Sequence, residues 1–264
     1  MLSDMFMFVT LITGASMGIG EALAREFASK GHNLLLVARS GEKLISLAEE
    51  LRKDGRVKVE VCVEDLSVVD GPARVYEFCC RQHIKVDLLV NCAGLSRAGG
   101  FYDIPTGKLE EIVMVNMMAM ALLTRLFLAD MVERNEGGII NIASLGGLQG
   151  VPGLGLYSAT KAFVITLSEA LYMELRGKGV KVVVVCPGFI ETDFFEHAGH
   201  NTAHLRLPLS GVEVVVSAAI NGLKKNKLYV YPTLLDKALV LSQRVVSRKT
   251  VIRLAGFFAA VPDG

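Results

Sequence analysis

The sequence predicts an α/β fold, a doubly wound parallel sheet that forms a single domain with a C-terminal helical extension. Two observations lead to this prediction. Short apolar runs alternate with longer amphipathic segments, and the runs are continuous rather than alternating, which is typical of strands covered on both faces. A glycine-rich turn also joins the first strand directly to the first helix. The alternation continues to about residue 188, so we expect one domain over residues 1–264.

The expected strands are the apolar runs rich in valine, isoleucine and leucine, residue types that favour buried strands. In chain order they are FMFVTLIT (6–13), NLLLVA (33–38), VKVEVCVEDL (57–66), VDLLVNCAG (86–94), GIINIAS (138–144) and VKVVVVCPG (180–188).

The expected helices are the longer segments with apolar residues three and four positions apart. They cover 20–31, 41–55, 70–83, about 107–134 and 157–176. Gly31 ends the first helix, as glycine commonly does. In the second, Leu44, Leu47, Ala48 and Leu51 define the apolar face.

Composition narrows the function classes. The chain has 264 residues, is 52% hydrophobic and carries a net charge of +1, so it can bury a large core and gives no argument for nucleic acid. Its five cysteines form no CxxC pair, which favours free thiols and a cytoplasmic location. The N-terminus lacks the basic start of a signal peptide, and we expect no window of about 18 uncharged apolar residues for a membrane span.

The turn from Thr13 to Gly20 reads TGASMGIG, with the spacing Gly-x-x-x-Gly-x-Gly. Glycines at the first strand–helix junction let the backbone approach a pyrophosphate at the positive end of the helix dipole. We interpret the turn as a phosphate site; a turn that only packs the helix on the sheet is the alternative. The second strand ends in Ala38-Arg39, where a guanidinium suits a 2′-phosphate and favours NADP(H) over NAD(H).

Seven motifs in order resemble the short-chain dehydrogenase/reductase family, in its NADP-preferring single-domain branch with a Rossmann fold. They are TGASMGIG (13–20), EDL (64–66), NCAG (91–94), Asn116 in MVNMMA, Ser144 in INIAS, YSATK (157–161) and CPGFIETDF (186–194). The resemblance covers about residues 5–195. Where the family often has a second asparagine, this chain has Cys92, which we interpret as a buried packing residue.

The resemblance implies a set of cofactor contacts. Asp65 would lie by the adenine, Thr192 would bind the nicotinamide carboxamide, and Lys161 would bind the nicotinamide ribose. The full implied set is Gly14, Ser16, Gly18, Ile19, Gly20, Arg39, Asp65, Leu66, Asn91, Ala93, Gly94, Tyr157, Lys161, Pro187, Gly188 and Thr192.

The catalytic residues implied are Asn116, Ser144, Tyr157 and Lys161. Tyr157 and Lys161 are four residues apart in an expected helix and so share a face. We expect Lys161, together with an oxidised nicotinamide, to lower the phenol pKa from about 10, which makes Tyr157 a general acid/base. Ser144 would bind the substrate oxygen, and Asn116 would hold a water that passes protons to Lys161.

The predicted function is therefore hydride transfer between NADP(H) and a carbonyl or alcohol carbon. A non-catalytic NADP-binding regulatory protein on the same fold is the alternative from another class. The resemblance also implies a homodimer or homotetramer, in which the helices of 107–134 and 157–176 pair with a second subunit.

Three loops at the carboxyl ends of the strands are expected to contact the substrate: 95–103, 145–155 and 189–210. They predict a mostly apolar carbonyl or alcohol substrate from Leu95, Phe101, Leu148, Val151, Leu154, Phe189, Phe194 and Phe195. The third loop also carries His197, His200 and His204, which we interpret as part of a mobile lid rather than as a metal site.

The tail of 224–264 is basic and apolar. Between Lys224 and Arg253 it has Lys224, Lys225, Lys227, Lys237, Arg244, Arg248, Lys249 and Arg253 against one acid, Asp236. A basic amphipathic helix on an anionic membrane and a solvated helix at a subunit contact both fit. Peripheral membrane contact would favour a long-chain keto lipid, such as 3-ketosphinganine, as the substrate.

Overall fold

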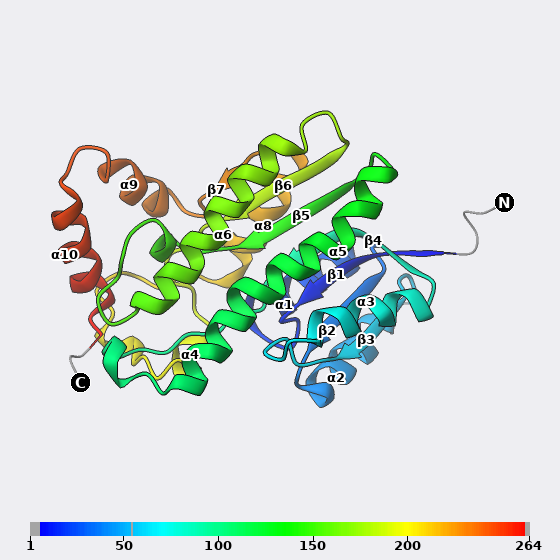
Figure 1. Cartoon of the computed structure of the whole chain (residues 1–264), viewed down its shortest axis with the longest axis horizontal. Helices are drawn as coiled ribbons and strands as arrows, with labels where there is room; N and C mark the ends of the chain where they lie inside the picture. The colour runs from blue at the N-terminus through cyan, green and yellow to red at the C-terminus, as the bar shows by residue number, and fades with distance from the viewer. Residues whose placement is uncertain (1–5, 54, 262–264) are drawn as a thin grey trace.

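The computed structural model describes residues 6–53 and 55–261, and within these ranges it contains one parallel seven-stranded sheet in the order β3-β2-β1-β4-β5-β6-β7. The strands are β1 (Met7–Thr13), β2 (Leu34–Ala38), β3 (Val59–Val63), β4 (Ile84–Asn91), β5 (Gly137–Ile142), β6 (Val180–Val185) and β7 (Tyr229–Val230). The order reverses between β1 and β4, which places a topological switch point at the centre of the sheet (Figure 1).

Helices cover both faces of the sheet. One face packs against α1 (Gly18–Ser29), α2 (Gly41–Arg52) and α8 (Val212–Lys224), and the other against α3 (Gly71–Arg81), α5 (Met120–Glu133) and α6 (Gly155–Glu174). Side chains alternate along each strand, so Leu34 and Leu36 of β2 enter the first layer and Leu35 and Val37 enter the second. The doubly wound parallel sheet predicted from the sequence is confirmed.

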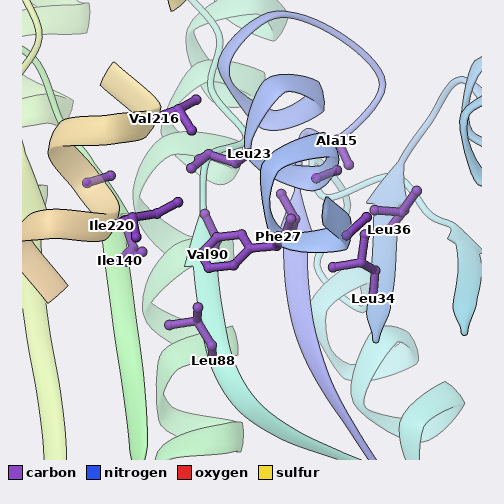
Figure 2. Close-up of a cluster of buried hydrophobic side chains, with 14 of the residues drawn as sticks. Ala15, Leu23, Phe27, Leu34, Leu36, Leu88, Val90, Ile140, Val216 and Ile220 are labelled. Carbon is purple, nitrogen blue, oxygen red and sulfur yellow. The ribbon is translucent and has the colours of Figure 1, made fainter. Parts of the chain in front are cut away.

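Figure 2 shows the first of these layers. Leu23 and Phe27 of α1 lie over Val90 of β4, and Val216 of α8 lies beside Leu23. All four side chains are at most 5% exposed. Burying four such side chains stabilises the fold by about 1.5–3 kcal/mol each.

The sheet extends further along the chain than the sequence pattern indicates. After residue 188, α8 returns the chain to the edge of the sheet, and β7 adds a strand beside β6. β7 has only two residues, Tyr229 and Val230. A strand this short carries no periodicity that a sequence pattern can detect.

The long helix expected near 107–134 contains a π-helical turn. It consists of α4 (Thr106–Val113), the turn η3 (Met114–Ala119) and α5. By length and composition alone, Thr106–Glu133 is apolar enough to cross a membrane. This stretch is not uncharged, since Arg125 lies between Ile112 and Ala129, so the expectation of no window of about 18 uncharged apolar residues is not contradicted. However, the inward-facing side chains of the helix Thr106–Glu133 pack on the sheet as in a core helix, and Met131 is fully buried.

The helical extension consists of α9 (Leu234–Ser242) and α10 (Arg248–Ala259). Figure 1 shows both helices at the left end of the molecule, beyond the sheet. A capping box starts α9, in which the Thr233 hydroxyl accepts from the Asp236 backbone N–H and the Asp236 carboxylate accepts from that of Thr233. This extension is therefore a defined part of the fold.

Candidate active site

A cavity of about 540 Å³ lies at the carboxyl ends of the strands. Its wall runs from the glycine turn after β1, past the ends of β4, β5 and β6, to α9 and α10. From the expected site it brings together Gly14, Ser16, Gly18, Ile19, Gly20, Arg39, Asp65, Leu66, Ala93, Gly94, Ser144, Tyr157, Lys161, Pro187, Gly188 and Thr192. The cavity includes the switch point, where open α/β sheets bind their ligands.

The glycine turn forms one end of the cavity, and its geometry excludes side chains. Gly14 has a φ of +67°, and a Cβ there would lie 2.8 Å from the Ala93 Cα. A Cβ on Gly20 would collide with the carbonyl oxygen of Gly14. Thr192 lies across the same turn, 3.2 Å from where a Cβ on Gly18 would be. The turn is thus an open backbone surface at the start of α1, as a phosphate group requires.

Arg39 projects beside this turn from the end of β2. Its Nη1 donates to Glu111 Oε1 of α4 at 2.9 Å, and Lys108 Nζ donates to Glu111 Oε2 at 2.8 Å. Burial acts to raise the Glu111 pKa, but bonds to Lys108 and Arg39 outweigh it and the pKa is lowered. Sequence reasoning missed Lys108 and Glu111, since they lie in a helix distant in sequence from Arg39.

Asp65 lines the cavity at the end of β3, as expected. Its Oδ1 accepts from the backbone N–H of Ser67 at 2.8 Å and from the Ser67 hydroxyl at 2.7 Å. Burial acts to raise the Asp65 pKa, but these bonds and the charge of Arg39 leave the pKa below its ordinary value. Asp65 is therefore an ionised acceptor held in one orientation.

Ser144, Tyr157 and Lys161 meet at the middle of the cavity. Ser144 follows β5, and its hydroxyl accepts from the Gly146 N–H at 3.0 Å. Tyr157 projects from the first turn of α6, and Lys161 Nζ lies 5.7 Å from its ring centroid. The three groups thus surround one space in which a substrate oxygen can lie.

The pKa of Tyr157 differs in direction from the expectation. Burial raises the phenol pKa to about 12, and a hydrogen bond from Ser144 opposes this rise only in part. Burial also lowers the Lys161 pKa to about 8, and Lys161 Nζ donates to the Ile142 carbonyl oxygen at 2.7 Å. Desolvation therefore outweighs the hydrogen bond from Ser144, and the protein's own groups keep the phenol protonated at neutral pH.

Asn116 lies in the π-helical turn, behind the cavity. Its Oδ1 accepts from Leu95 N at 2.7 Å, and its Nδ2 donates to Leu95 O at 2.8 Å and to Thr160 Oγ1 at 2.9 Å. A second cavity of about 10 Å³, roughly enough for one water, is lined by both Asn116 and Lys161. This arrangement is compatible with the expected water, which stays a prediction.

Asn91 is placed differently from the expectation that it lines the cofactor cavity. It is 6% exposed, and its Nδ2 donates to Asn141 Oδ1 at 2.9 Å and to Thr124 Oγ1 at 3.1 Å. Asn91 and Asn141 are register partners in adjacent strands, so their side chains project to the same face of the sheet. Asn91 therefore belongs to a buried network that joins β4, β5 and α5.

Cys92 packs against the first core layer, as expected, and also lines the cavity. Burial raises the pKa of its thiol to about 12, so the thiol stays protonated and is a poor nucleophile at neutral pH.

The histidines of the third loop have separate surroundings. His200 is buried, with Nε2 2.8 Å from the Ala259 carbonyl oxygen, and His197 Nδ1 lies 2.6 Å from the Asp193 carbonyl oxygen. The side chain of His204 lies outside the described residues. Among those described, no three His, Cys, Asp or Glu side chains form a group that could hold a metal.

The far end of the cavity is apolar. Leu95, Val151, Leu154, Phe189, Phe194 and Phe195 line it as expected. The Phe194 and Tyr157 ring centroids are 5.6 Å apart, so this wall begins directly beside the phenol. Two expectations are wrong: Phe101 is 62% exposed, and Leu148 packs against the buried cluster around Val164.

The remaining wall comes from the C-terminal extension, which sequence reasoning had assigned to a membrane or subunit contact only. From α9, α10 and the residues beside them come Leu235, Asp236, Leu239, Gln243, Val246, Val251, Leu254, Ala255, Phe258 and Ala259. Asp236 is 5% exposed, and its Oδ1 would lie 2.5 Å from a Cβ on Gly188. Folding of the tail over the strand ends thus completes the cavity.

The comparison with known proteins also separates the first part of the chain from its C-terminal extension. Residues 8–203 match the family model of short chain dehydrogenases. A ketoacyl reductase of the granaticin polyketide synthase from Streptomyces violaceoruber is 38% identical over 200 residues, which are 74% of this chain and 72% of that protein. The very-long-chain 3-oxoacyl-CoA reductase of Anas platyrhynchos is 35% identical over 69% of this chain, but this match spans only 59% of that longer protein.

A solved structure is similar over almost the whole chain. The short-chain dehydrogenase from Sphingobium yanoikuyae, in complex with NADPH, superposes with a TM-score of 0.81 at 33% sequence identity. The superposition covers 92% of this chain and 96% of that one, so it extends beyond residue 203, where the match to the family model ends.

Proposed function

This chain belongs to the short-chain dehydrogenase family of oxidoreductases, and from that membership we propose that it transfers a hydride between NADP(H) and a carbonyl or alcohol carbon of a mostly apolar substrate. The observation that supports this proposal is the position of Ser144, Tyr157 and Lys161 in one cavity. They lie between a glycine-lined end and an apolar end, where a cofactor and a substrate would meet.

The residues present fit NADP(H). The open backbone at Gly14 and Gly18 suits the pyrophosphate, and the cations Arg39 and Lys108 near the end of β2 suit a 2′-phosphate. The NADPH complex of the similar Sphingobium enzyme supports this choice of cofactor. The nicotinamide supplies or accepts the hydride.

The protein's side chains handle the proton and the charge on the substrate oxygen. In carbonyl reduction, Tyr157 would donate its phenolic proton to that oxygen, and in alcohol oxidation it would take the proton back. Ser144 would donate a hydrogen bond to the same oxygen as negative charge develops there. A phenol with a pKa of about 12 is protonated at neutral pH, which is the form that donates the proton in carbonyl reduction.

The apolar wall supports a ketone that carries a long apolar substituent. Phe189, Phe194 and Phe195 form a contiguous aromatic group, with ring centroids 5.9 and 6.1 Å apart for the two pairs that share Phe195. Both relatives described above carry names of reductases that act on ketoacyl groups. A 3-oxoacyl chain or a long-chain keto lipid is therefore the substrate class we propose.

Two further proposals concern assembly and location. Met118 and Met173, on the η3 turn and α6, are 45% and 57% exposed, which supports a homo-oligomer formed through these helices. The free cysteines support a cytoplasmic location. Light scattering on the purified protein tests the first, and a result of one chain per particle would contradict it.

Substitution of Tyr157 by Phe tests the catalytic proposal. The variant should bind NADPH as the wild type does, measured by nucleotide fluorescence, and should lose at least about a hundredfold in kcat on long-chain ketones. Tyr76→Phe, which removes a phenolic hydroxyl on α3 away from the cavity, is the matched control and should keep wild-type turnover. Undiminished turnover of the Tyr157 variant, or a wild type that binds NADPH and reduces no ketone in a broad panel, would instead indicate a non-catalytic NADP-binding protein.

A further inference from the structure

The outward surface of α9, α10 and their connection, which we call the C-terminal face, exposes large apolar side chains. Leu234 is 81% exposed, Val245 is 84%, Leu241 is 58% and Phe257 is 54%. Scattered single apolar residues are normal on a protein surface, but four within 24 positions of one helix pair form a candidate contact surface.

The same face is strongly basic. Lys237, Arg244, Arg248, Lys249 and Arg253 are all exposed. The sole acid in the sequence from Leu234 to Ala259 is Asp236, which is 5% exposed and held in the capping box. The face therefore concentrates positive charge in a chain whose net charge is only +1.

The face is continuous with the cavity. Leu235, Val246 and Leu254 line the cavity and are also 40%, 38% and 45% exposed, so they form an apolar rim. The middle of this cavity holds Ser144 and Tyr157. An apolar substrate that entered across this rim would reach the catalytic groups along apolar side chains.

We propose that the C-terminal face docks on the surface of an anionic phospholipid bilayer and receives a long-chain carbonyl substrate from it. Apolar side chains flanked by lysine and arginine bind such interfaces by inserting between headgroups while the cations contact phosphates. The identification of the substrate rests on the proposed function; the docking itself does not.

A second copy of this chain is the competing occupant of the face. In a two-fold symmetric contact the same patch meets itself, so the five cations would face five more with no exposed acid from this segment between them. The charge pattern therefore favours a lipid surface over self-association.

Flotation with vesicles tests the docking. Vesicles of phosphatidylcholine alone are compared with vesicles that also contain phosphatidylglycerol, in the absence of substrate and cofactor. The wild type should float only with the anionic vesicles, and added salt should weaken this binding. The double variant Arg244→Glu/Lys249→Glu and the single variant Val245→Ser should each bind at least about tenfold more weakly.

The control has the same charge change elsewhere: Lys224→Glu/Lys225→Glu, at exposed positions at the end of α8. Equal loss of binding in this control, or no flotation of the wild type with anionic vesicles, would overturn the proposal. So would an Arg244→Glu/Lys249→Glu variant of lower oligomeric mass, since the face would then be a subunit contact. Tyr157→Phe should float like the wild type, so failure of the proposed chemistry would leave the docking result intact.

Discussion

Arg39 Nη1 lies 2.9 Å from Glu111 Oε1, which joins the end of β2 to α4 beside the glycine turn. The same carboxylate accepts from Lys108, so one anion holds two cations that face the cavity. Glu111 therefore accepts hydrogen bonds from Arg39 and Lys108, the same donors that a 2′-phosphate would accept from. Two predictions about cofactor preference follow from it.

Replacement of Arg39 by Asp should shift the enzyme from NADPH toward NADH. A carboxylate at this position would repel a 2′-phosphate and accept from a 2′-hydroxyl. We expect the ratio of kcat/KM for NADPH to that for NADH to fall at least about a hundredfold. An exposed arginine far from the cavity, Arg81→Asp, is the control. An unchanged ratio in the Arg39 variant would show that this residue makes no contact with the phosphate.

Replacement of Glu111 by Gln should tighten NADPH binding and leave NADH binding nearly unchanged. The amide keeps the size of the carboxylate but no longer competes with a phosphate for the two cations. The Kd for NADPH should fall by roughly threefold to tenfold, corresponding to about 1 kcal/mol. Glu110→Gln, at the exposed neighbouring position, is the matched control. Weaker NADPH binding in the Glu111 variant would mean that the carboxylate positions Arg39 rather than competing for it.

The contribution of Lys161 to stability should rise with pH between about 8 and 10.5. Its folded pKa is about 8 and its ordinary value is 10.5, so in this window the unfolded chain binds a proton that the folded protein does not. The cost of the buried ammonium is thus full below pH 8 and falls progressively toward pH 10.5. Buried thiols such as Cys92, whose raised pKa acts in the opposite direction at alkaline pH, are present equally in a Lys161→Met variant. The change in stability between pH 7 and pH 9.5, measured by denaturant unfolding, should therefore be more favourable in the wild type than in Lys161→Met by on the order of 1 kcal/mol. An equal change in both proteins would exclude the lysine as a contributor.

Replacement of Asn141 by Ala should destabilise the fold without changing cofactor preference. Asn141 is fully buried, accepts from Asn91 and donates to Ser168 Oγ at 2.9 Å. Its removal leaves buried polar partners unsatisfied, at a cost of about 2–4 kcal/mol. Urea unfolding measures the loss, and Asn221→Ala, at an exposed position in α8, should change stability by less than about 1 kcal/mol. A loss of similar size in both variants would argue against the network.

The sequence predicted best those features that depend on interactions between residues close together in the chain. The glycine turn combines positive φ at Gly14 with contact between residues close in sequence, and Tyr157 and Lys161 share a face because they are four apart in one helix. Continuous apolar runs likewise indicated strands buried on both faces, and hence the parallel sheet. The order of the motifs along the chain then indicated the family, which the match over residues 8–203 confirms.

Tertiary structure alone decided which distant groups meet and how buried they are. Glu111 is 72 residues from Arg39 in sequence, Asn91 turns toward Asn141 because of strand register, and α10 reaches the cavity only when the tail folds over the strand ends. The direction of the Tyr157 pKa shift has the same origin. A sequence shows that a cation is near a phenol, whereas the desolvation that raises the phenol pKa depends on the packing of the whole cavity wall.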